Sequence, residues 1–226
     1  MIYITGDTHI PHDIGKLNSK SFPNQKVLTK DDFVIICGDF GGVWDNSRTD
    51  LYWRKWLSEK NFTTLFVDGN HENFHLLNEF QIENRFGGKV HVIAPDLYHL
   101  MRGEVFNIDG QKIFCMGGAA SHDKMFRVQD INWWEEEMPT MQEMEYALKN
   151  LERNDWKVDY IVTHCAPKDT MRSIQGWYEN DAMTSFLQEV DSRCQYKHWY
   201  FGHYHTDKVI DDKHTVLYQK IKLLGE

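Results

Sequence analysis

Side chains that commonly bind metal ions follow five apolar segments of this sequence of 226 residues. They are carboxylates, a carboxamide and imidazoles, at Asp7, His9, Asp39, Asn70, His71, His164, His203 and His205. Each of them, taken singly, is typical of ordinary turns and loops. Together they offer oxygen and nitrogen donors and no thiolate, which suits two divalent transition-metal ions rather than calcium, magnesium or structural zinc. The sequence therefore predicts a metal centre built from several strand ends.

The opening residues, MIYITGDTH, contain the first of these groups. Residues 2–4 are β-branched or aromatic, which predicts a short buried strand that Gly6 ends in a turn. Asp7 and His9 lie two positions apart, so in an extended backbone their side chains point the same way. In open α/β sheets, ligands bind beyond the carboxyl ends of the strands. Alone, the pair is explained better by a capped turn and a loop histidine, but the same pattern returns at the other strand ends.

Two more apolar runs, residues 33–37 and 64–67, lead into the next candidate ligands. Continuous apolar runs of this length are typical of strands that are covered on both faces. A helix is expected over residues 72–80, which would place Asn70 and His71 in a strand-to-helix turn. The start of a helix favours an anion, so this turn is a natural place for a phosphate.

Further strands and helices must bring the remaining ligands into place. Apolar residues at a spacing of three and four predict helices over residues 50–60, 140–151 and 181–190. Strands over residues 159–163 and 198–201 lead into the histidines of the second half. The middle of the chain changes character, and its short strands suggest a second, more antiparallel sheet. These middle strands are predicted over residues 90–93, 97–101, 104–108 and 112–116, and a last hairpin over 209–210 and 216–218.

Composition limits the classes of protein to which the chain can belong. A hydrophobic content of 41% over 226 residues supports one globular domain spanning residues 1–226. A net charge of −9 argues against a broad nucleic-acid surface, because phosphate backbones are bound mainly by Lys and Arg. No signal peptide or membrane span is expected, so we expect a soluble, cytoplasmic protein. The four widely spaced cysteines are expected to be reduced.

The sequence resembles the calcineurin-like metallophosphoesterase family in five short blocks. The blocks are Gly6-Asp7-Thr8-His9, Gly38-Asp39, Gly69-Asn70-His71-Glu72, Thr163-His164 and Gly202-His203-Tyr204-His205. They occur in the family's order and span residues 6–205. The resemblance implies an α/β fold, a four-layer α/β/β/α sandwich of two mixed β-sheets packed face to face and flanked by helices.

The resemblance also implies a dinuclear site of Mn, Fe or Zn. Its two groups of ligands would be Asp7, His9 and His205 for one ion, and Asn70, His164 and His203 for the other, with Asp39 bridging them. A hydroxide shared by the ions would attack phosphorus in line. His71 would protonate the leaving oxygen or stabilise its charge. Asn70 is also expected to contact the substrate, and Glu72 either orients His71 or caps the following helix.

The sequence departs from one branch of the family. Protein Ser/Thr phosphatases continue the second block with an Asp-Arg pair that steadies the catalytic histidine and binds phosphate, whereas Asp39 is followed here by Phe-Gly-Gly-Val-Trp. This difference argues against protein phosphatase activity of that type. Arg127, in the long irregular stretch after residue 121, is a candidate replacement for substrate binding, and a solvated surface arginine is the alternative. Trp133 and Trp134 are expected to pack in the core or form a lid rather than stack on a base.

These features predict a phosphomonoesterase that acts on a phosphorylated small molecule or nucleotide-like substrate. A phosphodiesterase or nuclease would use the same metals with a different leaving group, and is the first alternative. A non-catalytic scaffold is the last alternative, because such scaffolds lose ligands and this sequence retains all of those expected.

Overall fold

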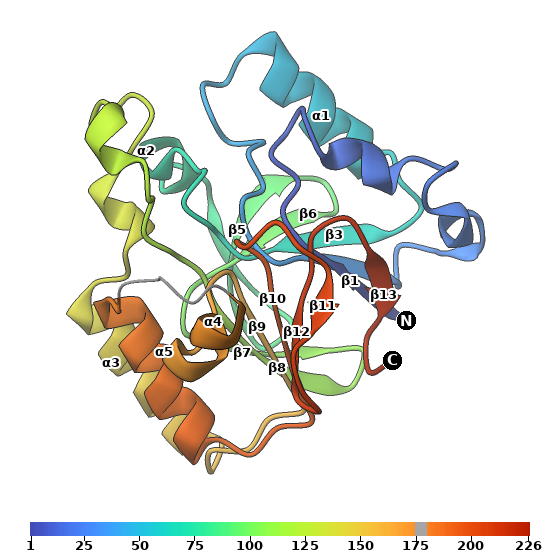
Figure 1. The fold of residues 1–226 in the computed structure, drawn as a ribbon. Coiled ribbons are helices and arrows are strands. Elements are labelled where there is room, and N and C mark those ends of the chain that lie inside the picture. Colours follow the sequence, from blue (N-terminus) through green and yellow to red (C-terminus); the bar gives the residue numbers. More distant parts are fainter. Residues whose placement is uncertain (175–179) are drawn as a thin grey trace.

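The computed structural model describes residues 1–174 and 180–226 of the chain (Figure 1). In this part of the chain the first β-sheet has seven strands. In spatial order they are β13 (Ile221–Leu223), β1 (Ile2–Thr5), β2 (Phe33–Ile36), β3 (Thr63–Phe66), β6 (Leu97–Leu100), β5 (Gly88–Ala94) and β4 (Ile82–Arg85). The four central strands β1, β2, β3 and β6 pair in parallel, and the outer strands pair antiparallel.

The second β-sheet has six strands within the described ranges. In spatial order they are β11 (Lys208–Val209), β12 (His214–Val216), β10 (His198–Phe201), β9 (Tyr160–Thr163), β8 (Gln111–Met116) and β7 (Val105–Ile108). The pairs β12–β10, β10–β9 and β9–β8 are parallel, and both outer pairs are antiparallel. Both sheets are therefore mixed, as the sequence predicted.

Apolar side chains from both sheets form one core layer between them. Ile4 and Ile35 of the first sheet belong to the same buried cluster as Ile113 and Val162 of the second sheet. Successive strand residues point to opposite faces, so Val34 and Ile36, on either side of Ile35, pack outward against helices. The two sheets therefore lie face to face.

Helices cover the outer face of each sheet. The helices α1 (Arg48–Ser58) and α2 (Phe74–Leu77) share a cluster with the first sheet, whereas α3 (Met141–Arg153), α4 (Lys168–Ile174) and α5 (Ala182–Arg193) share one with the second. Figure 1 shows α3, α4 and α5 gathered on one side of the molecule, away from α1. This arrangement confirms the predicted four-layer α/β/β/α sandwich.

The helix starts follow from local sequence. Thr140 and Glu143 form the capping box expected at the start of α3, and the Asp181 side chain accepts a hydrogen bond from the backbone of Thr184 in α5. Asn73 caps α2, which spans only residues 74–77 rather than the expected 72–80. In the ranges 1–174 and 180–226, no helix is long and apolar enough to span a bilayer.

The assignment of the middle strands to a second, antiparallel sheet is wrong in part. β6 is buried throughout and pairs in parallel with β3, so it joins the first sheet and brings β5 and β4 with it. Of these middle strands, β7 and β8 belong to the second sheet. A buried apolar strand of four residues has no feature that indicates the direction of its partner, which is why the pattern misleads here.

Candidate metal centre

The candidate ligands meet where the strand ends of both sheets meet. Asp7 follows β1, and Asp39 follows β2, so the first sheet supplies two carboxylates from adjacent strands. His164 directly follows β9, and the Gly202–His205 segment follows the neighbouring β10. The carboxyl ends of parallel strands meet at one edge of a sheet, so these four distant segments converge.

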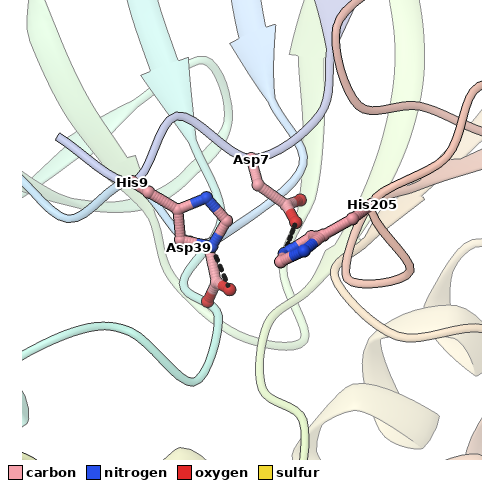
Figure 2. Close-up of side chains that lie close together, drawn as sticks. All are labelled: Asp7, His9, Asp39 and His205. Carbon is pink, nitrogen blue, oxygen red and sulfur yellow. Dashed lines mark hydrogen bonds and ion pairs between the residues drawn. The ribbon is translucent and has the colours of Figure 1, made fainter. Parts of the chain in front are cut away.

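Four of these residues form one tight group. One ligand atom each from Asp7, His9, Asp39 and His205 lies within 4.8 Å of all the others. The His9 Nε2 atom is 3.1 Å from Oδ2 of Asp39, and the His205 Nε2 atom is 3.4 Å from Oδ2 of Asp7 (Figure 2). The structure therefore brings together the residues predicted for the first metal position.

The remaining predicted ligands lie on the other side of Asp39. His164 Nε2 is 3.2 Å from Oδ1 of Asp39 and 3.2 Å from Oδ1 of Asn70. The rings of His164 and His203 are 4.9 Å apart between centroids. Asp39 thus directs one carboxylate oxygen towards His9 and the other towards His164, which is the placement that a bridging ligand requires.

The backbone at the site is unusual. Four of the candidate ligands have a positive φ, a conformation that few residues other than glycine adopt: His9 (31°), Asp39 (45°), His203 (68°) and His205 (46°). Two glycines of the motif blocks allow close approach of the carboxylates. A Cβ atom at Gly69 would lie 2.1 Å from Oδ1 of Asp39, and one at Gly202 would lie 2.0 Å from Oδ1 of Asp7. Glycine is therefore needed at both positions to let the backbone lie this close to the carboxylates of Asp39 and Asp7.

Hydrogen bonds to the outer ring nitrogens set the direction of two histidines. His9 Nδ1 is 2.8 Å from Oδ2 of Asp13, and His164 Nδ1 donates to the backbone oxygen of Cys37 at 2.8 Å. Each bond holds the proton on Nδ1 and leaves Nε2 to face the site. Asp13 was not singled out from the sequence, although its spacing of four residues from His9 is the signal that could have found it.

Burial and charge make the centre receptive to cations. Asp7 and Asp39 are 0% and 1% exposed, and buried carboxylates require positive charge nearby. Burial favours the neutral form of Asp39, but the facing His164 outweighs it and holds the Asp39 pKa well below its usual range. Burial likewise opposes the protonated form of His164, but Asp39 and Asp7 raise its pKa to about 10. Oxygen and imidazole donors that converge on buried carboxylates fit divalent transition-metal ions.

His71 lies beside this centre and contacts Arg127. The Arg127 Nη2 atom is 3.3 Å from Nε2 of His71, and because a guanidinium only donates, Nε2 is the acceptor. Arg127 Nε is in turn 2.7 Å from Oδ1 of Asp123. Burial lowers the His71 pKa, Asp39 opposes this, and the positive charge of Arg127 lowers it further. An arginine that is itself paired with an aspartate thus contacts the histidine, and both come from a part of the chain other than the second motif block.

The structure places Glu72 in a different position from the one expected. Its buried carboxylate accepts from the backbone N–H groups of Phe40 at 2.7 Å and Gly41 at 3.3 Å. Among the described contacts none joins it to His71, and the cap of α2 is Asn73 rather than Glu72. Glu72 therefore fixes the loop that follows Asp39.

A cavity opens directly beside the candidate ligands. Its volume is about 560 Å³, and its walls include His9, His71, His205, Trp44 and Tyr218. Trp133 and Trp134 are 9% and 2% exposed, so both are buried, as the expectation of core packing or a lid requires. The cavity beside the candidate ligands is thus lined by imidazole groups together with the aromatic rings of Trp44 and Tyr218.

Comparison with known families identifies the chain, whereas a comparison with curated proteins finds no match. The family model of the calcineurin-like phosphoesterases matches residues 1–207, which include all of the candidate ligands. The chain therefore belongs to the calcineurin-like phosphoesterases, whose general activity is the metal-dependent hydrolysis of phosphate esters.

Proposed function

We propose that the chain is a phosphomonoesterase that acts on small or nucleotide-like phosphate esters. The observation that carries this proposal is the position of Asp39 between two groups of donors, with one oxygen towards each. Two ions of Mn, Fe or Zn would be held by Asp7, His9 and His205 on one side and by Asn70, His164 and His203 on the other. Bound there, such ions would neutralise phosphoryl charge and lower the pKa of water.

The chain's own residues supply the remaining steps. We expect Arg127 to bind the phosphoryl oxygens, because it contacts His71 and a guanidinium pairs well with phosphate. Binding of the phosphate would draw Arg127 away from Nε2 of His71, and that nitrogen could then take up a proton. His71 would deliver this proton to the leaving oxygen as a general acid.

Charge and cavity size support a small substrate. A volume of about 560 Å³ accommodates a ligand of nucleotide size, and the net charge of −9 is unsuited to a long polyanion. Trp44 and Tyr218 in the cavity wall provide apolar surface for the organic part of the ester.

Hydrolysis of two model esters tests the proposal. The chelator-treated protein is assayed with p-nitrophenyl phosphate and bis-p-nitrophenyl phosphate, before and after addition of Mn²⁺. We expect hydrolysis of the monoester that requires added metal and that His71→Ala and Asn70→Ala both reduce. Preferred hydrolysis of the diester would support the phosphodiesterase alternative. Binding of Mn²⁺ without turnover of any phosphate ester would favour the scaffold.

A further inference from the structure

The carboxamide of Asn70 is bound from behind by two residues that are distant in sequence. Asn70 Nδ2 donates to Oγ of Ser121 at 3.3 Å, and the Ser121 hydroxyl donates to Oε2 of Glu137 at 2.7 Å. Oε1 of Glu137 also accepts from the Ser121 backbone N–H at 2.9 Å. The exposed fractions of Asn70, Ser121 and Glu137 are 6%, 9% and 1%, so water does not compete with these bonds.

Glu137 fixes the direction of every bond in this series. A carboxylate only accepts hydrogen bonds, so the single hydroxyl proton of Ser121 is committed to Glu137. The Ser121 oxygen then offers only lone pairs to Asn70, which the NH₂ group of the carboxamide can meet and its oxygen cannot. Oδ1 of Asn70 is thereby turned to the opposite side, 3.2 Å from Nε2 of His164.

We propose that Ser121 and Glu137 are positioning residues that keep the Asn70 oxygen, rather than its NH₂ group, facing the second metal position. If the carboxamide were turned over, its two N–H protons would face the cation and repel it. This inference rests on the proposed role of Asn70 as a metal ligand and adds to it the residues that make that role possible. Mutation of a residue that hydrogen-bonds to a metal ligand typically lowers metal affinity by about 10–100-fold.

The backbone around Glu137 is itself held in place. Its carbonyl oxygen accepts from the backbone N–H of Ala119 at 3.1 Å, and the preceding carbonyl of Glu136 accepts from Nη2 of Arg102 at 2.7 Å. Arg102 is anchored by an ion pair with Asp68 at 2.7 Å, just beyond the end of β3. The carboxylate therefore has a fixed position relative to the strand that leads to Asn70.

Glu137→Gln tests the proposal with almost no change of shape. The amide oxygen of the introduced glutamine must accept from the Ser121 backbone N–H, so its NH₂ group donates to the Ser121 hydroxyl oxygen. The Ser121 hydroxyl proton is then no longer committed to residue 137. Both directions of the Asn70 carboxamide then become compatible with Ser121. Calorimetric titration of the metal-free protein with Mn²⁺ should show the second ion bound about tenfold more weakly or worse, and the first ion unchanged. Glu104→Gln is the matched control. Glu104 lies away from the site, is 7% exposed, and its carboxylate accepts a hydrogen bond of 2.7 Å from the Tyr146 hydroxyl.

A double variant separates this role from a merely structural one. Asn70→Asp alone opposes a carboxylate to a Ser121 oxygen whose proton is committed to Glu137. In the Glu137→Gln background that proton is free and can be donated to the new carboxylate. We therefore expect the double variant to bind the second Mn²⁺ more tightly than Asn70→Asp alone, whereas structural damage would give additive losses.

Equal affinity of the wild type and Glu137→Gln for the second ion would overturn the inference, as would additive losses in the double variant. Binding of fewer than two Mn²⁺ ions by the wild type would also overturn it. If the wild type binds two ions but hydrolyses no phosphate ester, the proposed function fails, and the titrations still decide the roles of Ser121 and Glu137.

Discussion

The guanidinium of Arg127 lies 3.3 Å from the imidazole of His71, a residue 56 positions earlier in the chain. His71 lies in the wall of the cavity beside the candidate ligands, and Arg127, which contacts it, is also paired with Asp123. Next to the proposed general acid, a positive group can stabilise the negative charge of a phosphoryl group.

Arg127→Ala should lower kcat/KM for p-nitrophenyl phosphate roughly hundredfold, because one donor to the phosphoryl oxygens is lost. Arg127→Lys should recover only part of the loss, because an ammonium cannot form a bidentate pair with phosphate. Steady-state kinetics with Mn²⁺ check both. Arg172→Ala serves as control, since Arg172 is half exposed and pairs with Asp169 on α4. Unchanged kinetic constants in Arg127→Ala would show that Arg127 does not bind the substrate.

His71→Gln should lower kcat by about 10²–10⁴-fold, because the general acid is lost while the metal ligands remain. The loss should be larger for an alkyl phosphate than for p-nitrophenyl phosphate, because a poor leaving group depends more on protonation. Rates with both esters, together with the metal content of the variant, check this. An equal loss for the two leaving groups would contradict the role of His71 as general acid.

His214 should make stability depend on pH at the far end of the second sheet. Burial lowers the His214 pKa, but Asp191 and Asp211 outweigh burial and raise it above its usual value. The raised pKa means that the folded state holds this proton more tightly. The contribution is complete below about pH 6.5, the ordinary histidine value, and is lost as the pH rises through the folded pKa.

Urea unfolding of the wild type and His214→Gln between pH 5.5 and 8.5 measures this effect. The difference in unfolding free energy should be largest at low pH and should shrink as the pH rises. A constant difference would show that the proton on His214 does not contribute to stability.

Arg102→Met should destabilise the fold by about 3–5 kcal/mol, because it leaves the Asp68 carboxylate buried without its main partner. Chemical unfolding checks the value. Arg193→Met is the matched control at an exposed pair with Glu189, where we expect a change of about 1 kcal/mol or less. A small effect at Arg102 would mean that the hydrogen bond between His99 and Asp68, at 3.0 Å, is enough to satisfy the buried carboxylate.

The sequence predicted those parts of the site that directly follow strands. Asp7 and Asp39 follow apolar runs that can be recognised locally, and parallel pairing brings their ends together. Asp13, Ser121 and Glu137 were not predicted as site residues because their roles arise from loop placement. Glu137 belongs to the acidic triplet 135–137, and such runs normally face water, whereas its carboxylate is 1% exposed.

The fold was predicted where the apolar pattern was strong and was missed at its edges. β13 is a half-buried edge strand of three residues, and β4 carries the mostly exposed sequence Ile-Glu-Asn-Arg, so neither shows a clear period. Their pairing partners define them as strands, and those partners are distant in sequence for β13. Local pattern therefore fixed the central strands but not the outer ones.

The candidate metal centre draws on both sheets, and this has a consequence for how the protein is made. Its first candidate ligand, Asp7, leaves the ribosome long before His203 and His205 are synthesised. During that interval the carboxylate of Asp7 lacks the His205 imidazole that faces it in the finished fold. We therefore expect metal binding to follow translation of almost the whole chain, because a polypeptide that stops before residue 203 lacks a residue from each of the two proposed ligand groups.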